Sequence, residues 1–319
     1  MNNIMFCSCG RRVQLFKFLK DSLGDSCKII ATDLQSIAPA LYAADKHYLT
    51  PRIDASNYID TVLKIAKDND VKAITTLIDP EIEILAKNRE RFEENNIIVL
   101  APSKNTASHC FDKYEMFCYL KENNIRTVLT YDSLEHFIEG YNNKEIDFPV
   151  FIKPRTGSGS VGIHKCTTME ELRSYFVEAK FDYIIQEFIE GSICTVDYIR
   201  DYNGDDFSIA REELLRTKNG AGTTVRVFFN EKLKDTVSYI GGVLNIVGCV
   251  NMEFILFNDE YYLIDINPRF SAGVAFSNLV GYDMISNHIS AINGLRINQG
   301  RCYSDQILCK HYLESVIVQ

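Results

Sequence analysis

The chain has 319 residues, of which 46% are apolar, so it is long enough for about two domains with sizeable cores. A net charge of -9 excludes the concentrated positive charge that binding to a nucleic-acid backbone requires. No apolar run approaches the roughly 18 residues that cross a bilayer, and the N-terminus lacks the pattern of a signal peptide. We therefore expect a cytoplasmic protein without a membrane or nucleic-acid partner, whose ten cysteines are reduced and mostly buried.

The first hundred residues alternate short apolar runs with helical stretches, which is typical of a parallel sheet covered by helices. Strands are predicted at 4–7, 28–32, 72–77 and 97–100. Between them, Ser56 is predicted to cap a helix with apolar residues three and four apart, and Asp79 with Pro80 begins another. This half of the chain is predicted to be Rossmann-like.

The pattern changes after Pro102. Two helices are predicted, one capped by Ser103 and one over 112–123. Residues 148–189 then predict a strand, a glycine loop, a strand, a helix with a capping box, and a strand. Further strands follow, with a helix near 231–246, a hairpin over 249–266 and a last helix near 282–294.

The glycine loop at 156–163, TGSGSVGI, matches the spacing of a phosphate-binding loop. A strand follows it instead of a helix, which excludes a dinucleotide fingerprint, and Ile163 with His164 excludes a Walker loop. The pattern predicts a flap whose backbone N–H groups cover phosphates. Lys153 lies just before it among apolar residues, where an unpaired ammonium is costly, so we expect it to face a phosphate.

The hairpin carries Glu253 on its first strand, and Asp265 and Asn267 on its second. Such hard oxygen ligands suit Mg2+ bound to nucleotide phosphates. A two-residue loop would place Glu253 opposite Ile264 and turn Asp265 to the other face. We therefore predict a loop of odd length, such as 258–260, with Glu253 directly opposite Asp265.

These motifs together resemble the ATP-grasp superfamily, and within it the single-module proteins similar to the carbamoyl-phosphate synthase large subunit. The resemblance extends over the whole chain and depends on Asp112-Lys113, FPVFIKP, TGSGSVGI, QEFIEG, TVD, NMEF and DINPR in that order. It implies an α/β plus α+β fold, with a Rossmann-like N-terminal domain followed by an ATP-grasp module. The expected divisions are 1–102 for the first domain, 103–188 for the helical linker and lid subdomain, and 189–319 for the C-terminal antiparallel-sheet subdomain.

The resemblance also implies roles for individual residues. Lys113 and Lys153 would contact the α and β phosphates, and Gln186 the adenine amino group. Glu253, Asp265 and Asn267 would hold Mg2+ or Mn2+, and Arg269 would be catalytic. Arg216, which precedes the loop at 217–224, is predicted as a second catalytic residue on its position alone. The full implied nucleotide-binding set is Lys113, Lys153, Thr156, Gly157, Ser158, Gly159, Ser160, Val161, Gln186, Glu187, Phe188 and Ile189.

The activity that the resemblance implies is ATP-dependent ligation of a carboxylate to an amine or ammonia, through an acyl phosphate, with release of ADP and phosphate. Small-molecule carboxylate and amine substrates, and a homodimer, are expected. Carbamoyl phosphate synthesis requires two phosphorylations, normally in two modules, and this chain has one. The alternatives are a nucleotide-binding regulator without turnover and an NAD(P)-dependent oxidoreductase. Against the oxidoreductase, CSCGRR offers only Gly10 for the approach of a pyrophosphate.

One position departs from the family. Ile193 replaces the Glu that usually binds the ribose hydroxyls, which predicts poor discrimination against 2'-deoxy-ATP unless Glu190 or Asp197 takes over. Asp265 is also one methylene shorter than the Glu that is commoner there.

A substrate site is predicted at the carboxyl edge of the first sheet, where ligands bind in wound sheets. Arg11 and Arg12 begin the first helix, where the helix dipole disfavours cations. Asp33, Asp79 and Glu81 are expected at the same edge. We predict that these groups hold the amino-acid-like part of a substrate, with the loop at 217–224 closing over it.

Overall fold

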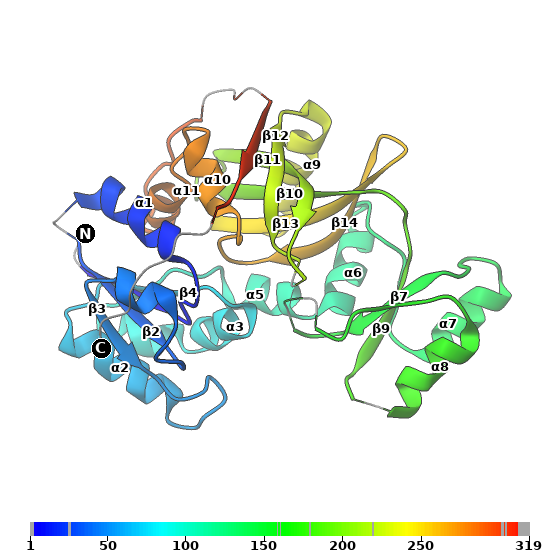
Figure 1. Cartoon of the computed structure of the whole chain (residues 1–319), viewed down its shortest axis with the longest axis horizontal. Coiled ribbons are helices and arrows are strands. Elements are labelled where there is room, and N and C mark those ends of the chain that lie inside the picture. The colour runs from blue at the N-terminus through cyan, green and yellow to red at the C-terminus, as the bar shows by residue number, and fades with distance from the viewer. Residues whose placement is uncertain are drawn as a thin grey trace.

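The computed structural model describes residues 3–24, 27–157, 159, 161–178, 180–218, 220–300, 303 and 305–311 (Figure 1). These residues form three sheets, and the N-terminal sheet and the lid sheet lie at opposite ends of the view. Within this part of the chain, no helix is long and apolar enough to cross a membrane.

The N-terminal domain is a parallel sheet of five strands in the order β3-β2-β1-β4-β5. Its elements are β1 (Ile4–Cys7), α1 (Val13–Leu23), β2 (Ile29–Asp33), a 3-10 helix (Pro39–Ala43), β3 (Lys46–Leu49), α2 (Tyr58–Asp68), β4 (Ala73–Thr76), α3 (Asp79–Lys87), α4 (Arg89–Glu93) and β5 (Ile98–Val99). The four predicted strands are confirmed to within a few residues. The predicted cap by Ser56 is wrong, because Asn57 is the N-cap of α2 and no side chain caps the helix there. The sequence missed β3 because this edge strand, KHYL, is mostly exposed and has no apolar run.

The lid subdomain contains an antiparallel sheet in the order β6-β9-β7-β8. The elements from the linker to the lid are α5 (Lys104–Phe111), α6 (Lys113–Glu122), β6 (Thr130–Tyr131), α7 (Leu134–Asn142), β7 (Val150–Pro154), β8 (His164–Cys166), α8 (Met169–Glu178) and β9 (Tyr183–Glu187). Half of the predicted capping box is confirmed, because the Glu171 backbone N–H donates to Thr168 Oγ1 at 3.2 Å. The Glu171 carboxylate accepts from the Thr167 N–H at 2.8 Å, one residue before the expected donor. The predicted flap joins β7 to β8, which pair antiparallel.

The C-terminal subdomain is an antiparallel sheet of six strands in the order β14-β13-β10-β11-β12-β15. Its elements are β10 (Ser192–Arg200), β11 (Asp206–Arg216), β12 (Gly222–Phe228), α9 (Glu231–Val243), β13 (Gly248–Phe257), β14 (Glu260–Asn267), α10 (Val274–Leu279), α11 (Met284–Ile292) and β15 (Gln306–Cys309). The predicted helix near 231–246 and the last helix are both present. The short helix α10 was not predicted.

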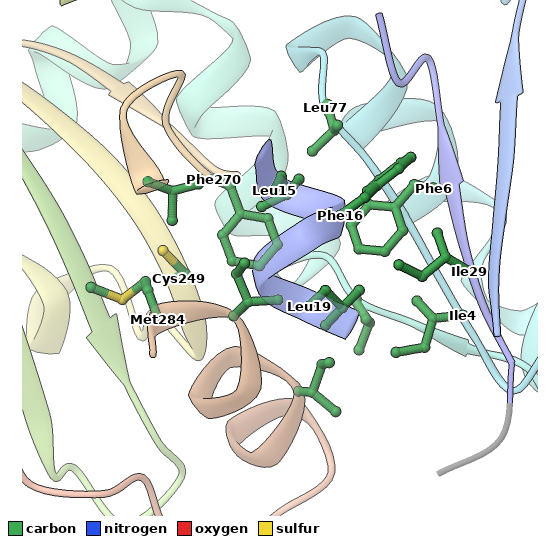
Figure 2. Close-up of a cluster of buried hydrophobic side chains, with 14 of the residues drawn as sticks. Ile4, Phe6, Leu15, Phe16, Leu19, Ile29, Leu77, Cys249, Phe270 and Met284 are labelled. Carbon is green, nitrogen blue, oxygen red and sulfur yellow. The ribbon is translucent and has the colours of Figure 1, made fainter. Parts of the chain in front are cut away.

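One apolar core joins the first domain to the last. Helix α1 buries Leu15, Phe16 and Leu19, and these side chains lie between the parallel sheet and the C-terminal residues Phe270 and Met284 (Figure 2). The carboxyl edge of the parallel sheet is therefore held close to the start of α10, just after the DINPR motif.

The hairpin of β13 and β14 combines a wrong prediction with a correct one. Its loop has two residues, Asn258 and Asp259, since Phe257 pairs with Glu260, so the predicted odd-length loop is wrong. Glu253 nevertheless pairs with Asp265, as predicted, because a β-bulge leaves Ile264 outside the ladder. The extra residue moves Asp265 back to the face of Glu253. Both loop residues have positive φ, 48° and 58°, which Asn and Asp tolerate.

Candidate functional site

A cavity of about 510 Å³ lies between the lid sheet and the C-terminal sheet. Most residues that the sequence assigned to nucleotide, metal and catalysis line it, namely Lys113, Lys153, Thr156, Gly157, Gly159, Val161, Gln186, Glu187, Arg216, Glu253, Asp265, Asn267 and Arg269. Ser158 and Ser160, which the sequence also placed there, lie outside the described residues. The fold thus brings residues from both parts of the chain beyond residue 102, 103–188 and 189–319, into one cavity.

The two lysines approach the cavity from different elements. Lys113 Nζ donates to the Gly157 carbonyl at 2.7 Å, under the glycine loop. Lys153 is 7% exposed, and its Nζ donates to the carbonyl of the bulged residue Ile264 at 3.5 Å. Burial lowers the pKa of Lys153 to about 8, against the opposing effect of Asp265. Neither contact supplies a carboxylate within hydrogen-bond distance, so both ammonium groups are available to an anion.

The glycine loop is anchored at its start to the N-terminus of α6. Asp112 caps that helix by accepting from the Tyr114 and Glu115 N–H groups, and it also accepts from Arg155 Nε at 2.8 Å. The Lys113 N–H donates to the Arg155 carbonyl at 3.1 Å. Three loop glycines then have φ of 119°, 73° and 75°, which side-chain-bearing residues rarely adopt.

The opposite wall of the cavity is apolar. Gln186 Nε2 donates to Thr130 Oγ1 at 2.9 Å, while Ile189 packs with Val128 and Ile255. Phe188 packs against Phe151, and of the residues assigned to the nucleotide, Phe188 and Ile189 do not line the cavity. The apolar residues that do line the cavity include Val128, Phe151, Ile193, Ile255 and Ile264.

Glu253, Asp265 and Asn267 share one face of the hairpin, where Asn267 Nδ2 donates to Glu253 Oε1 at 3.3 Å. Burial, and then the Asp265 charge, raise the pKa of Glu253, and Arg216 opposes this. The described residues contain no group of three His, Cys, Asp or Glu side chains arranged to hold a metal. Two carboxylates and an amide nevertheless fit Mg2+, which takes few protein ligands and keeps several waters.

Arg216 lies between two carboxylates. Its Nε is 3.6 Å from Glu213 Oε2, and its Nη2 is 3.6 Å from Glu253 Oε2. Its Nε also donates to the Gly220 carbonyl at 2.8 Å, within the predicted closing loop. The sequence missed Glu213, because no spacing rule links β11 to the hairpin.

The predicted substrate cluster is assembled only in part. Arg269 Nη2 donates to Asp79 Oδ2 at 2.6 Å and to Asn267 Oδ1 at 3.0 Å. Arg12 donates to the carbonyls of Ser271 at 3.2 Å and Leu77 at 3.3 Å. Burial, and then Arg269, lower the pKa of Arg12 to about 10. Arg12 and Asp79 of the N-terminal domain and Arg269 of the C-terminal subdomain thus lie close together where the two parts of the chain meet.

The other residues predicted for that cluster lie elsewhere. Glu81 is fully buried inside the N-terminal domain, where the hydroxyls of Tyr58 and Thr76 donate to it, so it does not join Arg12. Arg11 is exposed on the turn before α1. Asp33 Oδ2 accepts from the Gly10 N–H at 2.9 Å and so holds that turn. Glu81 and Asp33 thus accept hydrogen bonds within the N-terminal domain.

A buried ion pair lies next to the cavity, which Arg211 lines. Arg211 and Asp197 are 1% and 0% exposed, and Arg211 Nη1 donates to Asp197 Oδ2 at 2.5 Å. Arg211 Nη2 also donates to Ser271 Oγ at 3.2 Å. No sequence pattern identified Arg211, since its partners Asp197 and Ser271 lie on other segments of the chain.

Two family models match the chain. A PylC-like N-terminal domain matches residues 4–100, and an ATP-grasp domain matches residues 110–273, which is slightly more than half of the chain.

Solved structures of the same fold are similar over nearly the whole chain. The biotin carboxylase domain of Hydrogenobacter thermophilus 2-oxoglutarate carboxylase has a TM-score of 0.76 and 18% identity, over 93% of this chain and 71% of that one. N5-carboxyaminoimidazole ribonucleotide synthetase from Thermotoga maritima has a TM-score of 0.72 and 19% identity, over 96% and 80%. Rhizobium etli pyruvate carboxylase has a TM-score of 0.75 and 17% identity over 92% of this chain. The match spans only 29% of the much longer pyruvate carboxylase chain.

These likenesses confirm the predicted fold class, in which a parallel-sheet domain precedes a module with antiparallel sheets. They also agree with the motif order from Lys113 to Arg269, which falls within the matched range. The chain belongs to the ATP-grasp family.

Proposed function

We propose that this protein is an ATP-dependent ligase that forms a carbon–nitrogen bond between a carboxylate and an amine or ammonia. One observation favours this proposal above all. Lys113 and Lys153 share a single cavity with the paired carboxylates Glu253 and Asp265, beneath a glycine loop. Such an arrangement neutralises a polyphosphate from one side and holds a divalent cation on the other.

The cofactors of the proposed reaction are ATP and Mg2+. The biotin carboxylase domain of the Hydrogenobacter enzyme was crystallised with MgADP, ADP and bicarbonate, which supports a nucleotide in the corresponding fold. Glu253, Asp265 and Asn267 would hold Mg2+, which when bound neutralises phosphate charge. Lys113 and Lys153 would bind the phosphates, and the backbone of the glycine loop would exclude water from them.

The proposed reaction has two steps, and the bonds formed and broken in them balance without a further reagent. A carboxylate oxygen of the substrate attacks the γ-phosphorus, the bond to ADP breaks, and ADP leaves with the electron pair. The amine nitrogen then attacks the acyl carbon, phosphate leaves, and the nitrogen loses a proton. Arg269, two residues after β14, would stabilise the negative charge that develops in both steps.

The carboxylate substrate is proposed to bind near Arg12, Asp79 and Arg269. Arg12 donates only to backbone carbonyls among its described hydrogen bonds, so its charge is not directly paired with a carboxylate. In this proposal residues 1–102 form a domain that supplies Arg12 and Asp79, residues 103–188 supply the lid, and residues 189–319 supply the metal and catalytic groups. A homodimer remains part of the proposal.

The deciding experiment measures ADP and phosphate release with a panel of carboxylic acids, bicarbonate included, each with and without amines or ammonia. Release that depends on both partners, with 18O transfer from the labelled carboxylate to phosphate, is expected. Formation of AMP and pyrophosphate would overturn the acyl phosphate. Tight ATP binding without turnover with any pair would favour the regulator instead.

A further inference from the structure

We infer that Glu213 binds the ribose hydroxyls of the nucleotide, in place of the carboxylate that the chain lacks at Ile193. This inference rests on the proposed function, since it assumes that the cavity holds ATP. It assigns nucleotide specificity to Glu213 on β11, whereas the resemblance places the ribose-binding carboxylate on the neighbouring strand β10, at position 193.

The strand register places the two positions side by side. Strands β10 and β11 are antiparallel, with Thr195 opposite Arg211 and Cys194 opposite Glu212. Continuing this register by one residue sets Glu213 across from Ile193. Thr195 confirms the proximity, because its Oγ1 donates to Glu213 Oε1 at 2.8 Å. All of Ile193, Thr195 and Glu213 line the cavity.

Glu213 has a buried oxygen that lacks a hydrogen-bond donor. Its side chain is 6% exposed, and Oε2 has no hydrogen-bond partner among the described residues. Arg216 Nε lies 3.6 Å away, beyond hydrogen-bond distance. A buried carboxylate oxygen without a donor is destabilising, and nearly all such groups in proteins are satisfied. The adjacent hydroxyls of a ribose offer the missing donor.

The neighbouring strand leaves space for this carboxylate. A Cβ atom at Gly222 of β12 would collide with both carboxylate oxygens of Glu213. Glycine at this position therefore lets the side chain lie against the sheet at the edge of the cavity.

The other carboxylates near Ile193 are not available. Asp197 is fully buried, and it accepts from both terminal nitrogens of Arg211 and from Ser277 Oγ. Glu190 is exposed and does not line the cavity. Of the carboxylates closest to position 193 in the described structure, Glu213 alone faces the cavity with an unsatisfied oxygen.

This inference predicts the opposite nucleotide preference from the one that Ile193 alone predicts. An apolar residue there predicts poor discrimination between ATP and 2'-deoxy-ATP, whereas Glu213 predicts a clear preference for ATP. A hydrogen bond to a charged group corresponds to a preference of about tenfold or more.

The experiment titrates ATP, 2'-deoxy-ATP and 3'-deoxy-ATP at saturating Mg2+ into the wild-type protein, Glu213→Gln and Glu212→Gln. Gln keeps the volume of Glu213 and an acceptor for Thr195, but it lacks the charge. We expect Glu213→Gln to weaken ATP about tenfold while barely changing the deoxynucleotides. Glu212 lies on the opposite face of the same strand, bound to Arg226 Nε at 2.9 Å, so Glu212→Gln should retain the wild-type preference.

A second variant tests the replacement directly. Ile193→Glu in the Glu213→Gln background restores a carboxylate on β10 and should restore the preference for ATP. Equal weakening of all three nucleotides by Glu213→Gln, or a raised Mg2+ requirement, would overturn the ribose assignment. If the wild-type protein binds none of the nucleotides, the proposed function itself fails, so the two failures are distinguishable.

Discussion

Glu253 and Asp265 face each other across β13 and β14 because the bulged residue Ile264 is excluded from the ladder between them. Without the bulge, the two-residue loop would turn Asp265 to the opposite face. The same bulge directs the Ile264 carbonyl toward Lys153 Nζ, at 3.5 Å. One local irregularity thus pairs the two carboxylates and contacts the lysine that lies beside them.

Glu253→Gln and Asp265→Asn should each raise the Mg2+ concentration required for ATP turnover by at least about tenfold, the lower end of effects seen for metal-site neighbours. Thermal stability without nucleotide should stay equal or rise, because each change removes one charge from a repelling pair. Activity as a function of Mg2+ checks this. Glu260→Gln, a half-buried change at the start of β14 in the same hairpin, removes a carboxylate that pairs with Arg126 and Lys232 and should leave the Mg2+ requirement unchanged.

Lys153 should make nucleotide affinity depend on pH. Burial lowers its pKa to about 8, so the free protein loses this ammonium as the pH rises through 8. Binding a phosphate then requires uptake of a proton, and the Kd for ADP should rise above pH 8 by up to about tenfold per pH unit. Calorimetric titration from pH 7 to 9.5 checks this prediction.

Two variants of Lys153 separate charge from packing. Lys153→Arg keeps its charge over this range and should flatten the pH profile, whereas Lys153→Ala should abolish turnover without unfolding the protein. A wild-type Kd that stays constant across this range would contradict the role of Lys153 in binding phosphate.

Asp79→Asn should lower kcat without changing the KM for ATP. Asp79 holds the guanidinium of Arg269 at 2.6 Å, and loss of that charge leaves Arg269 free to turn away. Misplacement of a catalytic group by about 1 Å costs up to about 100-fold in rate. Steady-state kinetics check this, with Asp60→Asn, which breaks the exposed ion pair with Arg91, as the control expected to keep full activity.

Glu81 should make the N-terminal domain more stable in mild acid. Burial raises its pKa to about 8, from 4.5 in a model peptide. Between these values the folded chain keeps the proton that the unfolded chain loses, so the free energy of unfolding falls as the pH rises. The slope from this group is at most about 1.4 kcal/mol per pH unit.

Thermal unfolding of the wild type and Glu81→Gln from pH 5 to pH 8 checks this effect. Glu81→Gln should flatten the decline, because Gln carries no titrating proton. Glu90→Gln, an exposed change in α4 of the same domain, should leave the decline as it is. A decline that is identical in all three proteins would show that Glu81 ionises normally.

The sequence determined most of what depends on local periodicity and on contiguous motifs. Alternating apolar runs predicted the parallel sheet, and Thr168 with Glu171 predicted the start of α8, because both signals lie within a few residues of each other. The glycine loop and Lys153 likewise predicted a phosphate site. The glycines indicate a loop with exposed backbone N–H groups, and the apolar neighbours of Lys153 make an unpaired ammonium there costly.

Contacts between distant segments were decided only by the tertiary structure. Arg269 meets Asp79 across 190 positions, and Thr195 meets Glu213 on a different strand. Alternation alone could not predict the bulge at Ile264, because a single extra residue reverses every face that follows it. Residues that are close in sequence can also end up apart. Glu81 is two residues from Asp79, yet its carboxylate is buried in the N-terminal domain and does not join Arg269. The periodicity of a helix or strand determines which of its side chains share a face. Tertiary packing determines which other helix or strand that face contacts.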